Sequence, residues 1–404
     1  MINIKTGQNN NKTSPSLYFG SNQPTNLADK QDNGTKPCKF TQGGIILLNK
    51  PRHLSSNTAV NIVKRAVSAS KAGHLGTLDV EAEGLLPITL NSATRLFDMF
   101  LHKDKEYLTT IKFGEERDTF DLEGQITRTD DKIITAEQIQ AVLPLLQGKQ
   151  KQLPPAYSAK KIGGRKAYDL AREGKAPILE PKEVTVYDFS LIKQLSQSEA
   201  DELISKCSAC PENSTHHSTY FSENTTQNST HNSENESLNS TKNPAKSNVF
   251  QFKIACSSGT YVRALCRDLA EKLSTCAVCV DIIRTKCGIF DICGAEALEE
   301  IKAGNFTIIS PEKLFDFEKI VISQTIADKL LNGQFIKTSS LGCALSQTSS
   351  SGQTSALKQT SVLGKADLSG EYRIYAATND DNKAQFIGIG QIDDGLLKLT
   401  LRLN

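Results

Sequence analysis

Residues 73–89 read GHLGTLDVEAEGLLPIT, a stretch in which His74 and Asp79 lie five positions apart among small residues. Gly73 and Gly76 lack a side chain, so another backbone or a ligand can approach closely here. Asp79 can serve as a nucleophile, a general base, a metal ligand or the N-cap of a following helix, and the N-cap is the commonest of these roles. A lone histidine such as His74 is more often structural than chemical.

The composition sets broad limits on the class of protein. The chain has 404 residues, a hydrophobic fraction of 38% and no tryptophan. It is longer than one compact domain usually needs, and polar tracts dilute its apolar content. The formal net charge is +2, so any surface that binds nucleic acid has to be local. The sequence has no run of about 18 apolar residues, and its N-terminal segment lacks the apolar core of a signal peptide. We therefore expect no membrane span and a cytoplasmic protein.

Polar tracts divide the chain into two expected domains. Residues 1–40 hold few large apolar groups and are expected to form a disordered tail, because they cannot offset the ordering entropy. A first domain is expected over 41–305, interrupted by a flexible low-complexity insertion at 196–248. A second, small β domain is expected over 306–404, with a polar insertion at 338–362.

Hydrophobic patterns predict strands in both domains. A short apolar run predicts a buried strand at 45–48, and alternation predicts another at 104–114. The segment 249–255 also has the pattern of a strand. Near the C-terminus, the predicted strands are EYRIYAA (371–377), AQFIGIGQI (384–392) and GLLKLTLRL (395–403).

Helix signals stand between these strands. Ser55 and Ser56 are good N-caps for a helix over 57–69, and Thr135 has Gln138 three positions on, which is the spacing of a capping box. Apolar residues at helical spacing predict a helix after the strand at 249–255, and the segments 309–317 and 323–333 read as short helices.

Ten cysteines raise the question of a metal site. The pairs Cys207/Cys210 and Cys276/Cys279 each have the CxxC spacing of a zinc site. However, the first pair opens a polar tract and the second lies in apolar sequence, so small buried residues are the favoured interpretation. The block GEERDTFDLEG (114–124) resembles a fragment of a calcium loop but lacks the later ligands of such a loop. We therefore expect no metal.

Six blocks, taken in order, resemble the TruB family of pseudouridine synthases. The resemblance covers roughly residues 43–195 and 249–300. Two departures stand out: His53 replaces the glycine of the opening Lys-Pro block, and Val80 replaces the proline after GTLD. The six blocks are LLNKPRHLSSNTAVNIVKR, GHLGTLDVEAEGLLPITLNSATRLF, KEYLTTIKFGEERDTFDLEGQI, LPPAYSAKKIGGRKAYDLAREG, SSGTYVRALCRDLAEKL and IIRTKCGIF.

The resemblance implies a catalytic set. Asp79 of GTLD is implied as the catalytic carboxylate, acting on a uridine flipped out of its stack. Tyr107 is implied to stack on the flipped uracil and to help remove the C5 proton; its ordinary alternative is a core tyrosine on a strand. Arg263 is implied to pair with Asp79 and keep it ionised, whereas without the family an exposed helix arginine is favoured.

The resemblance also implies a binding set. His74 is implied to stack into the RNA loop near the vacated position, and Ile282 to line the uracil pocket. Lys50 is expected to be structural rather than chemical. Arg284 is expected either to contact phosphate or to anchor the fold. Arg165 and Lys166 are expected to contact phosphate, with a solvated charged face as the alternative.

Together these observations predict an α+β protein. The catalytic domain is expected to have the pseudouridine synthase fold with a mixed, largely antiparallel sheet, followed by a small PUA-like β domain. The implied activity is pseudouridine formation at the T-loop uridine of tRNA, position 55, by a monomer without a cofactor or an obligatory protein partner. The alternatives are a guide-RNA-dependent synthase subunit, which works in a ribonucleoprotein, and a non-catalytic protein that binds or folds RNA.

Overall fold

The computed structural model describes residues 40–101, 103–155, 161–162, 165–166, 179–208, 247–341, 369–378 and 384–403. Ten strands in these ranges form one long sheet, in the order β14-β1-β3-β12-β4-β11-β10-β7, with β13 paired to β12 and β2 paired to β3. Their bounds are β1 Gly44–Lys50, β2 Ala72–His74, β3 Glu83–Leu90, β4 Lys105–Phe113, β7 Gly148–Gln152, β10 Lys182–Gln194, β11 Val249–Cys256, β12 Ala277–Cys287, β13 Phe290–Asp291 and β14 Glu296–Ala297.

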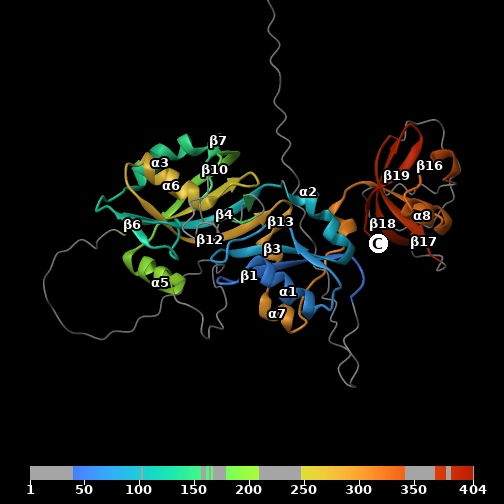
Figure 1. Ribbon diagram of the computed structural model, residues 1–404, viewed down its shortest axis with the longest axis horizontal. Helices are drawn as coiled ribbons and strands as arrows, with labels where there is room; N and C mark the ends of the chain where they lie inside the picture. Colours follow the sequence, from blue (N-terminus) through green and yellow to red (C-terminus); the bar gives the residue numbers. More distant parts are fainter. Residues whose placement is uncertain are drawn as a thin grey trace, which may run out of the picture.

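The long sheet is mixed and largely antiparallel, so the predicted fold class is confirmed. Only two pairs among its described strands are parallel, β1 with β14 and β12 with β3. The parallel pairing of β3 with β12 joins the two halves of the sheet near its middle (Figure 1). Two small hairpins lie outside the sheet: β5 (Glu115–Arg117) with β6 (Ile126–Thr129), and β8 (Lys161–Ile162) with β9 (Arg165–Lys166).

Helices cover the two halves of the sheet separately. On one half, α1 and α7 lie side by side against β1 and its neighbours (Figure 1). On the other half, α6 packs on β12 and β4, and α3 packs on β10. The bounds are α1 Ser56–Ala66, α2 Phe97–Leu101, α3 Ala136–Val142, α5 Gln197–Ser208, α6 Val262–Lys272 and α7 Leu298–Lys302, with short 3-10 turns η1 Asn91–Leu96, η2 Leu143–Leu146 and η3 Ile292–Gly294.

The two predicted helix starts are confirmed in detail. The Ser55 side chain caps α1 by accepting a hydrogen bond from the backbone N–H of Thr58. Thr135 and Gln138 form the reciprocal capping box at the start of α3, each side chain accepting from the other residue's backbone. Each cap satisfies backbone donors that the first helical turn leaves without a partner.

Two expectations from the sequence are wrong. No helix follows Asp79, because residues 83–90 form β3 instead, so Asp79 is not an N-cap. The expected insertion at 196–248 begins with the helix α5, which buries Ala200 and Cys207 and packs against β12. Its apolar residues, Ala200 with Leu203 and Ile204, join Leu195 and Val249 in a small core cluster. Residues 209–246 of the insertion, residues 1–39 of the N-terminal tail and most of the insertion predicted at 338–362 lie outside the described residues.

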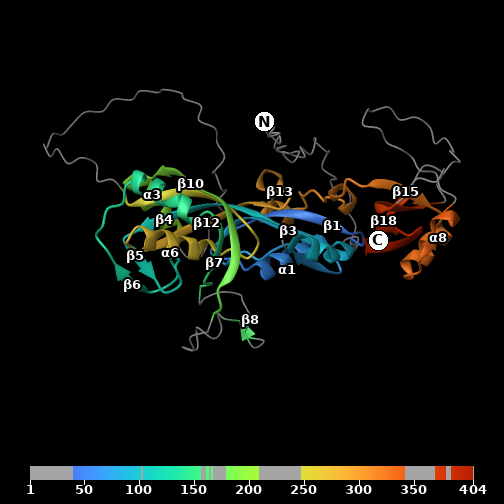
Figure 2. The same cartoon turned by 90° about the horizontal axis from the view of Figure 1, so that it is seen from above.

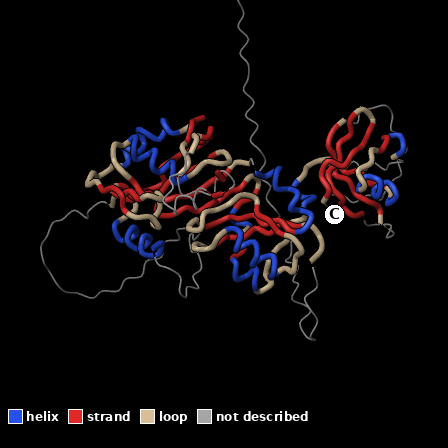
Figure 3. The backbone as a smooth tube through the Cα atoms, in the orientation of Figure 1, coloured by secondary structure: helices blue, strands red, loops and turns tan. Residues whose placement is uncertain are grey.

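The C-terminal unit contains a second sheet, as predicted. Figure 3 shows its strands apart from those of the long sheet, and Figure 2 shows the same arrangement from above. The three predicted C-terminal strands are confirmed, and the segment 309–317 holds only the 3-10 turn η4 (Pro311–Leu314). The five strands, in the order β15-β17-β18-β19-β16, are β15 Glu318–Ile322, β16 Ile336–Lys337, β17 Gly370–Ala377, β18 Ala384–Asp393 and β19 Leu396–Arg402, accompanied by α8 Gln324–Leu331 and η5 Thr338–Ser340.

The two sheets share apolar contacts. One core cluster includes Ile45 and Phe100 from the first unit together with Ile389 and Leu403 from the C-terminal strands. Ser92 donates a hydrogen bond to the backbone oxygen of Leu403 at 2.9 Å. Within the described part of the chain, no helix has both the length and the apolar character that crossing a membrane requires.

Candidate active site

The segment 75–82, here called the aspartate loop, connects β2 to β3 and carries Asp79. Its backbone is held by Ser56 at the start of α1. The Ser56 hydroxyl donates to the backbone oxygen of Leu78 and accepts from the Leu78 backbone N–H, both at 2.9 Å. The residue next to Asp79 is therefore fixed by a buried side chain on both its polar backbone groups.

Two buried cations also hold the aspartate loop. Lys50, at the end of β1, donates to the backbone oxygens of Pro51 and Leu54 at 2.8 Å and of Val80 at 3.3 Å. Burial lowers the pKa of Lys50 to about 8, against the opposing effect of nearby carboxylates. Lys50 thus has the structural role that the sequence predicted.

Arg284 of β12 is the second buried cation. Its guanidinium donates to the backbone oxygens of Leu85 at 2.8 Å and Gly76 at 3.1 Å. Gly84 lets the backbone of β12 lie close to β3 at Arg284, because a Cβ there would lie 2.5 Å from the Arg284 backbone oxygen. Arg284 therefore anchors the fold around Asp79, and its burial removes it from direct phosphate contact in this structure.

Arg263, at the start of α6, brings two carboxylates together. Its guanidinium lies 2.9 Å from the Asp79 carboxylate and 3.0 Å from that of Asp121. It also donates to the backbone oxygen of Thr119 at 2.9 Å. The Arg263 side chain is 7% exposed, whereas that of Asp79 is 41% exposed. The arrangement thus presents one carboxylate to solvent and holds it from behind with a buried guanidinium.

Electrostatics keep this cation charged. Burial acts to lower the pKa of Arg263, but Asp79 and then Asp121 outweigh it, and the pKa of the arginine is raised. Asp121 shows the opposite balance: burial raises the pKa of its carboxyl, and Arg263 only partly offsets this. A guanidinium with a raised pKa is a permanent positive charge beside Asp79.

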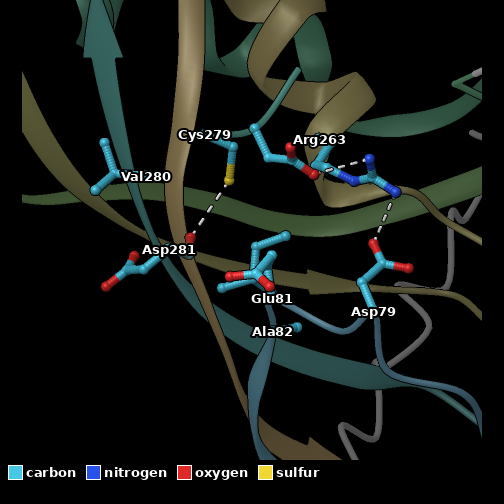
Figure 4. Close-up of a pocket in the computed structure, with 9 residues that line it drawn as sticks. Asp79, Glu81, Ala82, Arg263, Cys279, Val280 and Asp281 are labelled. Carbon is cyan, nitrogen blue, oxygen red and sulfur yellow. Dashed lines mark hydrogen bonds and ion pairs between the residues drawn. The ribbon is translucent and has the colours of Figure 1, made fainter. Parts of the chain in front are cut away.

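A pocket opens beside this pair. Figure 4 shows Asp79 and Arg263 joined on one side of it, with Glu81 between Asp79 and Asp281 in this view. The enclosed space is about 20 Å³, room for about one water molecule. The lining residues are Asp79, Glu81, Ala82, Asp121, Arg263, Cys279, Val280, Asp281 and Ile282.

Ile282 lies at the pocket, whereas Tyr107 is not among the residues that line it. Ile282 lines the pocket directly. Tyr107 of β4 pairs with Arg284 across the strands, two positions from Ile282, and both apolar side chains pack against the same two core clusters. Burial raises the pKa of the Tyr107 phenol, although the neighbouring Arg284 acts in the opposite direction. The phenol is accordingly neutral at ordinary pH.

The other predicted binding residues are less close to the pocket. His74 lies on β2 and is not among the lining residues. Burial and the charge of Arg284 lower the pKa of His74, so the imidazole is neutral near pH 7, and its Nδ1 has no hydrogen-bond partner among the described atoms. Arg165 and Lys166 form β9, but their side chains lie outside the described residues.

Sequence reasoning missed part of the site. Asp121 was considered only as a calcium ligand, yet its carboxylate binds Arg263 and accepts from Thr119 and from the backbone of Glu123. Glu81 lines the pocket, and the Arg52 guanidinium lies 3.9 Å from the Glu81 carboxylate. No pattern in the sequence indicates that Glu81 lines the pocket or that Arg52 pairs with it. The sequence holds one indication that Asp121 belongs to the site. It lies in the GEERDTFDLEG segment, which is part of a block that resembles the family.

The CxxC pairs do not form a metal site in the described structure. Cys276, just before β12, and Cys279 within β12 are free, buried thiols, and Cys207 is a buried thiol of α5. Cys210 lies outside the described residues. Across the ranges that the structure describes, no three His, Cys, Asp or Glu side chains are grouped to hold a metal ion.

Comparison with known proteins gives further evidence on the class of protein. A family model described as TruB family pseudouridylate synthase (N terminal domain) matches residues 64–210. The chain is 32% identical over 295 residues to the tRNA pseudouridine synthase B of Caldanaerobacter subterraneus subsp. tengcongensis, a match that covers 73% of this chain and 86% of that protein. It is 36% identical over 275 residues to the protein of the same name from Caulobacter vibrioides, covering 68% of this chain and 73% of that one.

A solved structure is also similar. A chain from "Structure of H/ACA RNP bound to a substrate RNA containing 2'-deoxyuridine" aligns with a TM-score of 0.49 at 15% identity, covering 89% of this chain and 85% of that one. The two tRNA pseudouridine synthases match the chain at more than twice this identity.

Proposed function

Because the chain belongs to the TruB family of pseudouridine synthases, we propose that it converts a uridine of tRNA to pseudouridine, at position 55 of the T-loop. The observation that carries this proposal is the contact between Asp79 and Arg263, 2.9 Å apart at the edge of a pocket lined by Ile282. The relatives named above are tRNA pseudouridine synthases, which supports tRNA as the substrate class.

Asp79 is the proposed catalytic residue. A uridine taken out of its stack would place its ribose against the exposed carboxylate. The carboxylate can attack C1′ or take a proton from C2′, and either route breaks the bond between C1′ and N1. The uracil rotates and C1′ bonds to C5, after which C5 loses its proton and N1 gains one. Atoms and electrons balance within the nucleotide, so the reaction is an isomerisation.

Other residues of the site have supporting roles in this proposal. Arg263 pairs with Asp79 and holds its carboxylate beside the pocket. Ile282 supplies an apolar wall for the base. Tyr107 is proposed to stack on the uracil and help remove the C5 proton, and His74 to stack in the RNA loop near the vacated position. The chemistry needs no redox step, because nothing is oxidised or reduced.

The proposed enzyme works alone in the cytoplasm, as a monomer, with the T-arm of tRNA as its partner. The guide-RNA-dependent branch of the family and a purely RNA-binding protein are the competing outcomes of the test.

The test uses the purified full chain and an unmodified tRNA transcript without guide RNA. Pseudouridine is mapped by carbodiimide-dependent primer extension. The expected product is at the T-loop uridine, and Asp79→Asn is expected to abolish it while tRNA binding stays within about twofold, because the amide keeps the size of the side chain. Asp98→Asn, an exposed aspartate of α2, is the matched control and should retain full turnover.

Each alternative predicts a different result. Tight tRNA binding without product would support a non-catalytic RNA-binding protein. Product only after addition of a guide ribonucleoprotein would support the other branch. Full turnover by Asp79→Asn would overturn the assignment of Asp79.

A further inference from the structure

His53, in the turn that follows β1, has a backbone conformation that L-residues rarely adopt. Its φ is 59°, in the left-handed region. Outside glycine this conformation carries an energetic cost, which persists only where the surrounding structure compensates for it. A glycine at position 53 would meet the demands of the turn without that cost. His53 therefore bears a backbone cost that glycine would not.

The contact that His53 makes is with Glu81. The imidazole Nδ1 lies 3.0 Å from the Glu81 carboxylate oxygen Oε1. Both side chains are partly buried, at 24% and 16% exposure. Glu81 comes two residues after Asp79 and lines the same pocket, so the contact joins the turn after β1 to the aspartate loop at the pocket wall.

Arg52 strengthens the same connection. Its guanidinium lies 3.2 Å from the Glu83 carboxylate and 3.9 Å from that of Glu81. On its other side it approaches the backbone oxygens of Val280 in β12 and Cys207 in α5, each at 3.5 Å. The turn thus contacts the C-terminal side of the aspartate loop through two consecutive side chains.

These contacts complete the support of Asp79. The N-terminal side of the aspartate loop is held by Arg284 at Gly76 and by Ser56 at Leu78. On the C-terminal side, the side-chain contacts include those of Lys50 with the Val80 backbone and of His53 and Arg52 with the glutamates. The Asp79 side chain is half-exposed, so its direction depends on how firmly the loop is fixed on both sides.

We propose that His53 and Glu81 are a positioning pair for the proposed reaction: their contact fixes the chain beyond Asp79 and holds that carboxylate at the distance from Arg263 that turnover needs. Neither residue is assigned a step in the chemistry. The proposal rests on the proposed function, and its test includes a measurement that does not depend on activity.

The experiment compares two substitutions at position 53. His53→Gly removes the contact and relieves the left-handed backbone. His53→Asn also tolerates that backbone, and its side-chain amide nitrogen is as many bonds from the Cα as the imidazole Nδ1, so it can donate to Glu81. The matched control is Ser68→Gly, which relieves a left-handed residue with φ of 52° after α1.

The expected pattern separates positioning from stability. His53→Gly should melt at or above the temperature of the unsubstituted chain, yet lose about tenfold in kcat with KM within twofold. His53→Asn should recover at least half of that loss, and Ser68→Gly should keep full turnover. His53→Gly added to Glu81→Ala should be no slower than Glu81→Ala alone, because without the Glu81 carboxylate His53 has no such contact left to lose.

Amide hydrogen exchange over residues 76–83 provides the second measurement. It should quicken in His53→Gly and remain unchanged in Ser68→Gly. Equal kcat and equal exchange in His53→Gly and the unsubstituted chain would overturn the proposal. If the unsubstituted chain modifies no tRNA, the proposed function fails, and the exchange comparison still decides whether this pair fixes the loop.

Discussion

The guanidinium of Arg263 touches both Asp79 and Asp121, so one buried arginine connects the start of α6, the aspartate loop and the turn between β5 and β6. The guanidinium also donates a hydrogen bond to the backbone oxygen of Thr119, so three acceptors surround one planar, forked group. A side chain with a single charged nitrogen cannot reproduce this geometry.

Substituting Arg263→Lys is therefore expected to impair turnover more than binding. The ammonium can pair with one carboxylate but not with both, which leaves Asp79 poorly aimed and a buried carboxylate at Asp121 without its partner. We expect kcat to fall about 100-fold and stability to fall by about 1–3 kcal/mol. Single-turnover kinetics and chemical denaturation measure the two effects, and a variant with normal kcat would show that the fork is dispensable.

The Tyr107 phenol is expected to stay protonated throughout the working range. Burial raises its pKa above the usual value of 10, so turnover should not rise between pH 7 and pH 9 through ionisation of this group. Tyr107→Phe keeps the ring for stacking and removes the hydroxyl. We expect it to bind tRNA normally and to lose turnover if the hydroxyl handles the C5 proton. A kcat profile that climbs with a midpoint near pH 8 in the unsubstituted chain, and is flat in Tyr107→Phe, would contradict the first expectation.

Glu123 is expected to make the stability of the fold depend on pH. Burial, followed by the charges of Glu81 and Asp121, raises its pKa from 4.5 to about 7. The folded chain therefore binds more protons than the unfolded chain between these values, and this contribution to stability falls as pH rises through that window. Glu123→Gln should accordingly be more stable than the unsubstituted chain at pH 8, with a smaller difference at pH 5.

Denaturant unfolding at the two pH values tests this expectation. Glu299→Gln, an exposed glutamate of α7, serves as the control and should show no comparable change with pH. A stability difference for Glu123→Gln that is the same at pH 5 and pH 8 would argue against a raised pKa.

The helix α5 is expected to matter for turnover, unlike the tract that follows it. Replacing residues 209–246 with a flexible Gly/Ser linker should leave kcat and melting temperature unchanged. Extending the deletion to residues 197–246 removes the α5 backbone oxygen that Arg52 approaches and uncovers part of β12. We expect the longer deletion to lower both quantities. Identical behaviour of the two deletion variants would show that α5 is as passive as the sequence suggested.

Much of the fold could be predicted because local signals were strong. The caps at Ser55 and Thr135 depend on neighbouring residues alone, and the strands β4 and β11 show their alternation directly. The helix α5 was missed because its sequence, QSEADELISKCS, has few apolar residues and runs into a polar tract. Its burial against Val249 and Leu195 is a tertiary effect that no local pattern reveals.

The residues of the site also differ in how far the sequence could predict their contacts. Asp79 and Arg263 were predicted as a pair from motifs that resemble a family, and the structure brings them into contact. The contact of His53 with Glu81 could not be predicted, because it depends on how the turn after β1 lies over the aspartate loop. The sequence leaves two roles open for Arg284, and in the structure it is buried and donates to backbone oxygens around Asp79.

The apolar cluster that joins Ile45 and Phe100 to Ile389 and Leu403 has a consequence for the evolution of the chain. A premature stop codon before β18 would remove Ile389 and Leu403. The first unit would then expose the apolar surface that these two residues cover. Quality-control proteases would be expected to degrade such a product instead of letting it persist as a smaller enzyme. Loss of the terminal strands is thus expected to destabilise the first unit, so the two parts of the chain are retained together.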